Sequence, residues 1–528
     1  MNGVSDLLQQ AISRHQQGDL ANAEPLYRAV LRVDPATEDA RALLGVLRAQ
    51  RGDIRMAASL VAEAIMLAPA RSDFCGHLGG ILAMAADGRR AARFLTRAVA
   101  LNPANLDAHT NLGKVETGAG RFGAALDHLR AALILVPSHV EATLNLADAL
   151  RRGGDPLASQ RWAARAMRLA GRRPEMLAML AQALADAGHL TEAVAAIDEA
   201  AQAAPGVAGI QWTAALIHLG AGDLQRGWPR FESRFAADPK LQYLFPPSRQ
   251  WRGEPIAGRR LLVWWEQGIG DEIFFASCLP ELMSSGARVT VGCDRRLADL
   301  FGRSFPGLDI IAAGSPPELR HAIADDAFDF HAPSGSLAAL LRPRAESFPP
   351  HGGFLRADDG AVAAWRERAA AAGEGLRVGI LWRGLLSTAE RGPGYTTLAD
   401  WRAVFDVPGL CFYDLQYGDT AAELRDAPPA LRDRLVRFPY LNLRNDFDNV
   451  AALMTALDLV IAPNTAAITL AGALGRPAWV LSRGFDWMRL GTDHYPWAPS
   501  IRCFLAPPGQ PWGPTMEAVA QALRHRVA

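Results

Sequence analysis

Lysine is almost absent from this sequence, in which Lys114 and Lys240 are the only two. Arginine carries the positive charge, and the 55 lysines and arginines balance the 55 aspartates and glutamates to a formal net charge of zero. A chain without excess positive charge offers no electrostatic basis for binding nucleic acid. Apolar runs are also short, and none reaches the roughly 18 residues of a membrane-spanning helix. We therefore expect neither a nucleic-acid partner nor a membrane span.

Cysteine is scarce, and its spacing excludes the usual structural zinc sites. The five residues form no C-x-x-C pair and no cluster with histidine: Cys75, Cys278, Cys293, Cys411 and Cys503. Free thiols suit a reducing compartment. The N-terminal residues are amphipathic and lack the charged start and apolar core of a signal peptide. We expect a cytoplasmic protein without a bound metal or cofactor.

A repeat with a period of 34 residues occupies the first part of the chain. Its turn positions are Gly18, Gly52, Ala86, Gly120, Gly154, Gly188 and Gly222. Its helix-ending positions are Pro35, Pro69, Pro103, Pro137, Gly171, Pro205 and Pro239, and its small positions include Ala23, Ala57, Ala91, Ala125 and Ala193. This pattern is typical of tetratricopeptide repeats. We predict an array of about seven units over residues 1–239, with a concave surface that holds a partner.

Each unit is expected to be two helices joined by a tight turn. Glycine at the turn permits a positive φ, and proline ends the second helix. Gly45, Gly79 and Gly113 lie inside first helices, where the missing side chain lets the partner helix approach. The seventh unit contains GWPRFESRF, residues 227–235, which is rich in aromatic residues and arginine. We interpret this segment as a cap that docks the array onto the rest of the chain.

The remainder of the chain alternates short apolar runs with helical stretches, as in a doubly wound α/β fold. In a first unit, 240–356, strands are predicted at 261–265, 287–293, 308–313 and 328–332. In a second unit, 357–528, they are predicted in RVGILW, CFYDLQY, VRFPY, DLVIAP and AWVLS. The predicted fold class is an α-solenoid followed by an α/β region of two Rossmann-like units. In such sheets, ligands bind beyond the carboxyl ends of the strands.

A glycine-rich turn follows the first predicted strand. It reads Gln267-Gly268-Ile269-Gly270-Asp271, and its two glycines let the backbone turn sharply and approach a ligand. Asp271 is expected at the start of a helix, where the dipole stabilises a carboxylate that can act as a base. A plain helix cap explains Asp271 equally well. The third glycine of a dinucleotide fingerprint and a Walker lysine are both missing, which disfavours NAD and ATP.

A second loop follows the predicted strand DLVI and starts a helix packed with small residues. Asn464, Thr465 and Ala466 stand at this helix start. Free amide groups and hydroxyls at a helix N-terminus suit a phosphate or diphosphate. Ordinary N-capping is the alternative, and the residues alone do not decide between the two.

Both loops carry a resemblance to one family of glycosyltransferases. WWEQGIGDEIFFASCLPEL and DLVIAPNTAAITLAGALGRPAWVL are similar to the two halves of heptosyltransferase-like enzymes. The chain resembles more closely the bacterial proteins that fuse tetratricopeptide repeats to such a domain, over nearly all of 227–510. The resemblance implies a GT-B fold, an inverting, metal-independent transfer from a nucleotide-activated sugar, and Asp271 as the catalytic base. Some repeat-fused members glycosylate flagellin in the cytosol, with the repeats holding the acceptor.

The resemblance also indicates residues on the donor side. The family has a basic loop after the first strand of its second unit, and this chain retains only part of it, including Arg383, Gly384 and Arg391. Guanidinium groups match the geometry of donor phosphates, whereas isolated loop arginines are usually solvated. Gln416, after CFYDL, lines the nucleotide pocket in one interpretation and is a polar strand end in the other.

Two further groups have alternative interpretations. Asp446 and Asp448 form a literal D-x-D, the metal motif of a different transferase fold, but they precede a helix and we interpret them as its cap. An aromatic group comprises Trp487, Tyr495 and Trp497. These residues could border a sugar, but such residues more often pack in a core.

Three functions follow from these patterns. We favour a cytosolic glycosyltransferase whose partners are a nucleotide sugar and a protein acceptor held by the array. A non-catalytic scaffold is the alternative, because the family usually has aspartate and histidine where this chain has Asn464 and Thr469. A lipopolysaccharide core heptosyltransferase is the third, and the array argues against it because a lipid acceptor needs no repeats.

Overall fold

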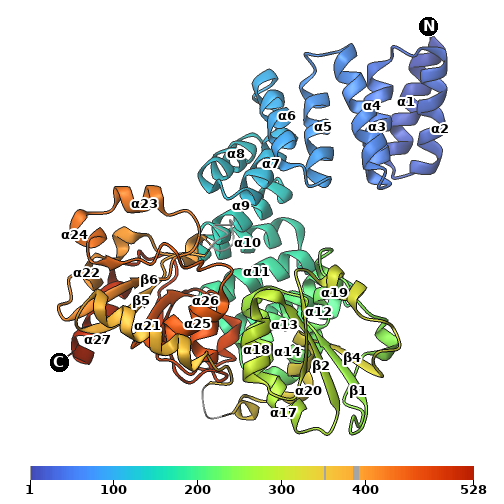
Figure 1. Cartoon of the computed structure of the whole chain (residues 1–528). Helices are drawn as coiled ribbons and strands as arrows, with labels where there is room; N and C mark the ends of the chain where they lie inside the picture. The colour runs from blue at the N-terminus through green and yellow to red at the C-terminus, as the bar shows by residue number, and fades with distance from the viewer. Residues whose placement is uncertain (1, 350–352, 385–391, 528) are drawn as a thin grey trace. The chain divides into compact units, whose positions relative to one another are not determined.

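The computed structural model describes residues 2–349, 353–384 and 392–527. Within these ranges the chain forms two compact units, of which the first ends at Arg172 and the second begins at Arg173. The predicted fold class is confirmed, because an α-helical solenoid is followed by an α/β region with two parallel sheets (Figure 1).

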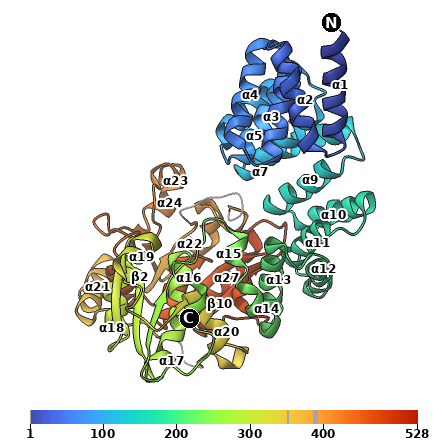
Figure 2. The same cartoon turned by 90° about the vertical axis from the view of Figure 1, so that its right-hand side faces the viewer.

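The first unit is a series of helix pairs, each of which is one repeat (Figures 1 and 2). Its helices in the described residues are α1 (Asn2–Gln16), α2 (Leu20–Val33), α3 (Glu38–Gln50), α4 (Ile54–Leu67), α5 (Ser72–Met84), α6 (Gly88–Leu101), α7 (Leu106–Gly118), α8 (Phe122–Leu135), α9 (Val140–Arg152) and α10 (Pro156–Ala170). Each odd-numbered helix packs against the even-numbered helix that follows it. The predicted two-helix repeat is therefore confirmed.

The turn residues of the repeats adopt the left-handed backbone that the sequence predicts. The φ angle is +78° at Gly18, +83° at Gly52, +77° at Gly120 and +91° at Gly154. At the same position of the third repeat, Ala86 has a φ of +58°. A residue with a Cβ pays roughly 1–2 kcal/mol for this conformation. The third repeat thus keeps the turn without the residue best suited to it.

Small residues let the paired helices approach closely. The alanines at the small position of this unit are fully buried: Ala23, Ala57, Ala91 and Ala125. A Cβ atom added to Gly79 would lie 2.5 Å from Cγ of Leu95, and Gly45 and Gly113 face their partner helices in the same way. These glycines are therefore required by packing, although glycine weakens a helix.

Replacing Ala86 with glycine should stabilise the array. Glycine removes the steric cost of the positive φ, and we expect a gain of about 1 kcal/mol after its larger loss of backbone entropy. The measurement is the midpoint of the helical unfolding transition, followed by circular dichroism in urea. Gly120→Ala, at the matching turn of the next repeat, should shift the midpoint in the opposite direction. A lower midpoint for Ala86→Gly would contradict the assigned strain.

The second unit begins with the last repeats and continues into the α/β region. Its first helices are α11 (Pro174–Asp186), α12 (Leu190–Ala203), α13 (Ala208–Gly220), α14 (Leu224–Phe231) and α15 (Arg234–Ala237). The helical part thus ends close to residue 239, but the last repeats belong to the same compact unit as the sheets. The following segment, 240–258, is packed rather than free, because Phe245 and Trp251 are buried and the Trp251 amide donates to the His331 carbonyl oxygen at 2.8 Å.

The first sheet has four parallel strands in the order β3-β2-β1-β4. They are β1 (Arg260–Trp264), β2 (Arg288–Asp294), β3 (Asp309–Ala313) and β4 (Phe330–Pro333), which confirms the four predicted strands. Trp264 pairs with Gly292 on one side and Pro333 on the other. The carboxyl ends of β1, β2 and β4 therefore lie level at one edge of the sheet.

The second sheet has six parallel strands in the order β10-β9-β8-β5-β6-β7. They are β5 (Leu376–Ile380), β6 (Leu410–Asp414), β7 (Leu435–Val436), β8 (Leu459–Pro463), β9 (Ala478–Arg483) and β10 (Ile501–Ala506). Four of the five predicted strands of this unit are present, whereas the predicted strand VRFPY overlaps the short β7 only at Val436. The edge strand β10 is an addition that the sequence did not indicate.

Helices connect the strands on both sheets. They are α16 (Ile269–Phe275), α17 (Leu279–Met283), α18 (Ala298–Ser304), α19 (Pro316–Ala322), α20 (Leu337–Leu341), α21 (Asp359–Ala372), α22 (Arg402–Phe405), α23 (Ala421–Asp426), α24 (Pro429–Arg432), α25 (Phe447–Ala456), α26 (Ala466–Ala473) and α27 (Gly513–Val527). One apolar core runs from α13 and α14 through both halves of the α/β region. Across the described ranges, no helix combines the length and apolar character needed to cross a membrane.

Candidate active site

The glycine-rich turn after β1 begins α16, as the sequence predicts. Gly268 is the N-cap residue, and Asp271 is the third residue of the helix rather than its cap. The Asp271 carboxylate folds back over the turn, since its Oδ2 lies 3.4 Å from the position that a Cβ atom of Gly268 would take. Asp271 is partly buried. In the first turn of a helix the dipole favours its charged form.

The loop after β8 presents the start of α26. Thr465 is the N-cap residue, but its hydroxyl donates to the Pro463 carbonyl oxygen at 3.1 Å and makes no capping hydrogen bond to the helix amides. Asn464 is exposed beside it. The first amides of α26 therefore keep their capacity to bind an anion.

These two loops, far apart in the sequence, meet in the structure. Helix α16 packs against α26. A Cβ atom on Gly270 would lie 3.4 Å from the Cα atom of Ala466, so the two helix starts are in van der Waals contact. Next to this contact, Nε2 of Gln267 is buried without a hydrogen-bond partner in the described part of the chain. The structure thus brings the predicted turn residues and the predicted phosphate loop to one place.

Gln416 holds the loop after β5 in position. Its Oε1 accepts hydrogen bonds from the amides of Trp382 and Arg383 at 3.0 and 2.9 Å. Its Nε2 donates to the carbonyl oxygens of Arg383 and Tyr417 at 2.9 and 3.0 Å. The buried amide is therefore saturated by protein groups, and any contribution to a nucleotide site comes from the backbone that it fixes.

Arg383 is occupied by another partner in this structure. Its Nε donates to Oε1 of Glu423 at 2.6 Å, and its Nη2 donates to the Asp419 carbonyl oxygen at 2.8 Å. A phosphate would have to share this guanidinium with Glu423. Gly384 lies against the ring of Tyr395, where a Cβ atom would clash. Arg391 lies outside the described residues.

A cavity of about 250 Å³ opens at the carboxyl ends of β6 and β7. Its lining includes Gln416 and Tyr417, which follow β6, and Arg437, Asn442 and Arg444, which follow β7. Arg437 is held by Asp414, whose Oδ2 accepts from its Nε at 3.0 Å. The position at the carboxyl edge of a parallel sheet is where such folds bind ligands.

Glu272, which sequence reasoning passed over, is buried directly beside Asp271. Its Oε1 accepts a hydrogen bond from the Asp294 amide at 2.9 Å and so links α16 to the end of β2. Its Oε2 has no partner among the described residues. Burial raises the pKa of Glu272 well above its ordinary value. Folding therefore disfavours the charged form of this carboxyl relative to the unfolded chain.

The alternative interpretations of the D-x-D and of the aromatic group are decided by contacts. Asp446 is the N-cap of α25 and accepts from the Asn449 amide at 3.1 Å, whereas Asp448 pairs with Arg303. Tyr495 and Trp497 are buried and stacked on each other. The capping interpretation is confirmed for Asp446 but not for Asp448, and the packing interpretation is confirmed for Tyr495 and Trp497. Trp487 also packs on other rings, edge-on against Trp228 and Phe274. The described ranges contain no group of three or more metal-ligating side chains.

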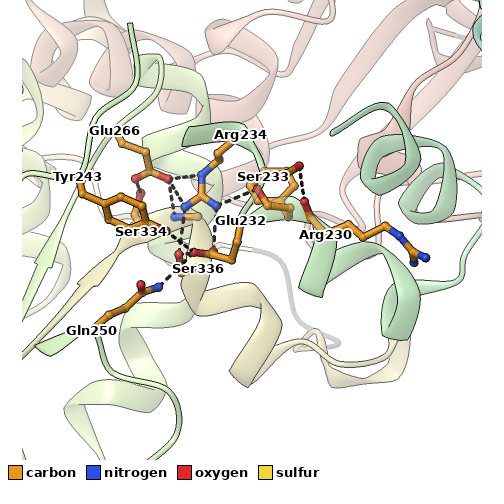
Figure 3. Close-up of polar contacts among 11 residues, drawn as sticks. Arg230, Glu232, Ser233, Arg234, Tyr243, Gln250, Glu266, Ser334 and Ser336 are labelled. Atoms are coloured by element: carbon orange, nitrogen blue, oxygen red, sulfur yellow. Dashed lines mark hydrogen bonds and ion pairs between the residues drawn. The ribbon is translucent and has the colours of Figure 1, made fainter. Parts of the chain in front are cut away.

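The segment 227–235 docks the last repeat onto the first sheet, as predicted. Arg234 and Glu266 form an ion pair whose side chains are 1% and 2% exposed. Nε and Nη2 of Arg234 donate to Oε1 of Glu266 at 3.1 and 2.9 Å, as Figure 3 shows. Ser334 donates to the other carboxylate oxygen at 3.2 Å. Because Glu266 directly precedes Gln267, this pair holds the start of the glycine-rich turn.

A second carboxylate completes the docking network. Glu232 accepts from Nη1 of Arg234 at 2.9 Å and from the Ser336 hydroxyl at 2.6 Å. Burial opposes its charge, but Arg234 and these hydrogen bonds outweigh burial and lower the pKa of Glu232. The nearby Trp228 donates its ring N–H to the Arg342 carbonyl oxygen at 2.8 Å. The repeat end is therefore joined to the sheet by buried charge and by aromatic packing.

Comparison with known proteins confirms the repeats. A tetratricopeptide repeat family model matches residues 8–72, 82–139, 117–174 and 144–208. The array is built of tetratricopeptide repeats. Among curated proteins, Protein FlbA of Caulobacter vibrioides is 38% identical over an alignment of 357 residues that covers 64% of this chain and 59% of FlbA. The chain therefore spans less than two thirds of the length of this relative.

Solved structures show partial likenesses that carry no argument about function. A tetratricopeptide repeat protein from Parabacteroides merdae is 17% identical, with a TM-score of 0.38, over 45% of this chain and 94% of that protein. PilF of Pseudomonas aeruginosa is 19% identical, with a TM-score of 0.35, over 39% of this chain and 93% of PilF.

Removing the Arg234 side chain should destabilise the second unit strongly. Arg234→Met leaves Glu266 as a buried charge without its partner, and we expect a loss of about 3–5 kcal/mol. Adding Glu266→Gln should recover part of this loss, because the unpaired charge disappears. Arg230→Met is the matched control, since the Arg230 guanidinium points away from the cluster in Figure 3. Equal effects of the two arginine variants in urea unfolding would contradict the assigned role.

Glu272 should make stability depend on pH. A raised pKa in the folded state means that stability falls as pH rises above the ordinary glutamate value of 4.5. Glu272→Gln keeps the acceptor for the Asp294 amide and removes the titration, so its advantage over the parent should grow from about pH 4 to about pH 8. Thermal unfolding at both pH values measures this. Glu367→Gln, an exposed change on α21, should show no such trend.

Proposed function

We propose that this protein transfers a sugar from a nucleotide-activated donor to a protein acceptor that the repeat array holds. The observation that carries the proposal is the contact between Gly270 and Ala466. It sets a candidate base beside uncapped helix amides, and both lie beyond the carboxyl ends of parallel strands. The resemblance to repeat-fused glycosyltransferases, whose base is the aspartate of this turn, supports the same reaction.

In the proposed reaction Asp271 takes the proton of an acceptor hydroxyl. The oxygen attacks the anomeric carbon as the bond to the donor phosphate breaks, and the configuration inverts. The amides at the start of α26 stabilise the negative charge on the departing nucleotide. The cavity lined by Gln416 and Arg437 is the proposed place for the nucleoside. Flagellin is the acceptor that the resemblance favours.

A non-catalytic scaffold is the second candidate, and two observations favour it. Arg383 is paired with Glu423, and Asn464 and Thr469 replace the acidic residue and histidine usual in the family. Binding of nucleotide sugars distinguishes the candidates. A panel of UDP-, GDP-, CMP- and ADP-sugars is titrated against the full chain by calorimetry. The scaffold requires no binding by any of them.

Asp271→Asn should abolish most of the transfer without unfolding the protein. Losing a general base lowers such rates by about 100-fold or more. Intact-mass analysis of flagellin from cells that carry the parent or the variant measures the modification. Asp299→Asn is the matched control, because Asp299 is an exposed aspartate in the first turn of α18. Full modification by the Asp271 variant would remove Asp271 as the base.

A further inference from the structure

A pocket of about 230 Å³ lies in the first unit, among the first helices of three successive repeats. Helix α3 contributes Val46, Ala49 and Gln50 to it. Helix α7 contributes Asp107 and Asn111. Helix α5 lies between them and contributes Asp73, Gly76, His77, Gly80, Ile81 and Met84. First helices of tetratricopeptide repeats face the concave side of a solenoid, where such arrays bind partners. The pocket is therefore open to a segment of another protein.

The floor of the pocket is kept open by glycine. Gly76 and Gly80 both line it, one helical turn apart on α5. The nearest atom to a Cβ placed on Gly80 would be Nδ2 of Asn111, at 3.6 Å. No steric contact with the paired helix explains the absence of a side chain at Gly80, in contrast to Gly79. The space above Gly80 belongs to the pocket.

The charge in the pocket is negative. Asp73 and Asp107 both line it. Arg71 pairs with Asp73 and with Asp39, at 2.7 and 2.8 Å. Asp107 has no ion pair within the described ranges and is exposed. Burial lowers the pKa of His77 and so disfavours its charged form. One carboxylate is thus left to meet a cation.

The polar groups of the pocket recur at the period of the repeat. Acidic residues stand in the first turn of each first helix, at Asp39, Asp73, Asp107 and Glu141. One turn later come His77, Asn111 and Asn145 on the successive helices α5, α7 and α9. Acids in the first turn also stabilise their own helices, but that role does not require the amide and imidazole groups beside them. Polar side chains that recur on successive first helices suit an extended polypeptide, whose backbone groups also recur at regular intervals.

We propose that this pocket binds a lysine or arginine side chain of an extended polypeptide segment. Asp107 pairs with the cationic end, and the Asn111 amide bonds the main chain of the segment. The aliphatic stem of the basic side chain packs on Val46, Ile81 and Met84, and Met84 adapts to its shape. The proposal rests on the proposed function only in naming this segment as part of the acceptor protein.

The test uses the full chain and two labelled peptides in fluorescence anisotropy. One peptide alternates lysine with glycine and serine, and the other has glutamate in place of lysine. The lysine peptide should bind, and raising the salt concentration should weaken it. Asp107→Asn should weaken its binding by about tenfold. Asp127→Asn is the matched control in the same repeat, because Asp127 is an exposed residue of α8 outside the pocket.

A second variant tests the pocket without changing its charge. Gly80→Leu fills the space and improves helix propensity, so folding is not at risk. It should remove most of the binding. Equal binding of both peptides, no binding of either, or full binding by Asp107→Asn and Gly80→Leu would overturn the proposal. The binding assay contains no nucleotide sugar, so it does not depend on sugar transfer. The Asp271→Asn variant should therefore bind the lysine peptide as tightly as the parent.

Discussion

The buried ion pair between Arg234 and Glu266 is the constraint on which the second unit depends. It lies where a repeat helix meets the end of β1, and both side chains are almost without solvent contact. Two charges in such a place are tolerated only when hydrogen bonds complete their coordination, and Ser334, Ser336 and Glu232 supply these bonds. The last repeats are consequently part of the fold that carries the candidate site and not an appendage to it.

This constraint acts on the site through one short stretch of chain. Arg234 and Ser334 hold Glu266 in place, and the turn from Gln267 to Asp271 begins immediately after Glu266. On the other side the turn rests on α26 through Gly270. Asp271 is thus supported on one side by the Arg234–Glu266 ion pair and on the other by the start of α26. A candidate base held in this way keeps its orientation without relying on a flexible loop.

The sequence predicted the repeats and nearly all strands because their signals are local. The fixed spacing of Gly18 and its counterparts predicts a turn in each repeat, and short apolar runs predict buried strands. Strand β10 was missed because an edge strand with exposed Arg502 and Leu505 lacks such a run. The contact of Gly270 with Ala466 and the pairing of Arg383 with Glu423 depend on tertiary packing, which spacing along one chain does not encode. Glu272 was missed because a buried unpaired glutamate is rare.

The position of the boundary at Arg172 has a consequence for how such a protein can change over generations. Repeats before it contact one another in series, so a duplication or loss of one 34-residue unit there would lengthen or shorten the array by one step. Repeats after Arg173 are tied into the α/β core and cannot be added or lost in the same way. The number of repeats before Arg172 can therefore change while the repeats after it stay fixed to the α/β core.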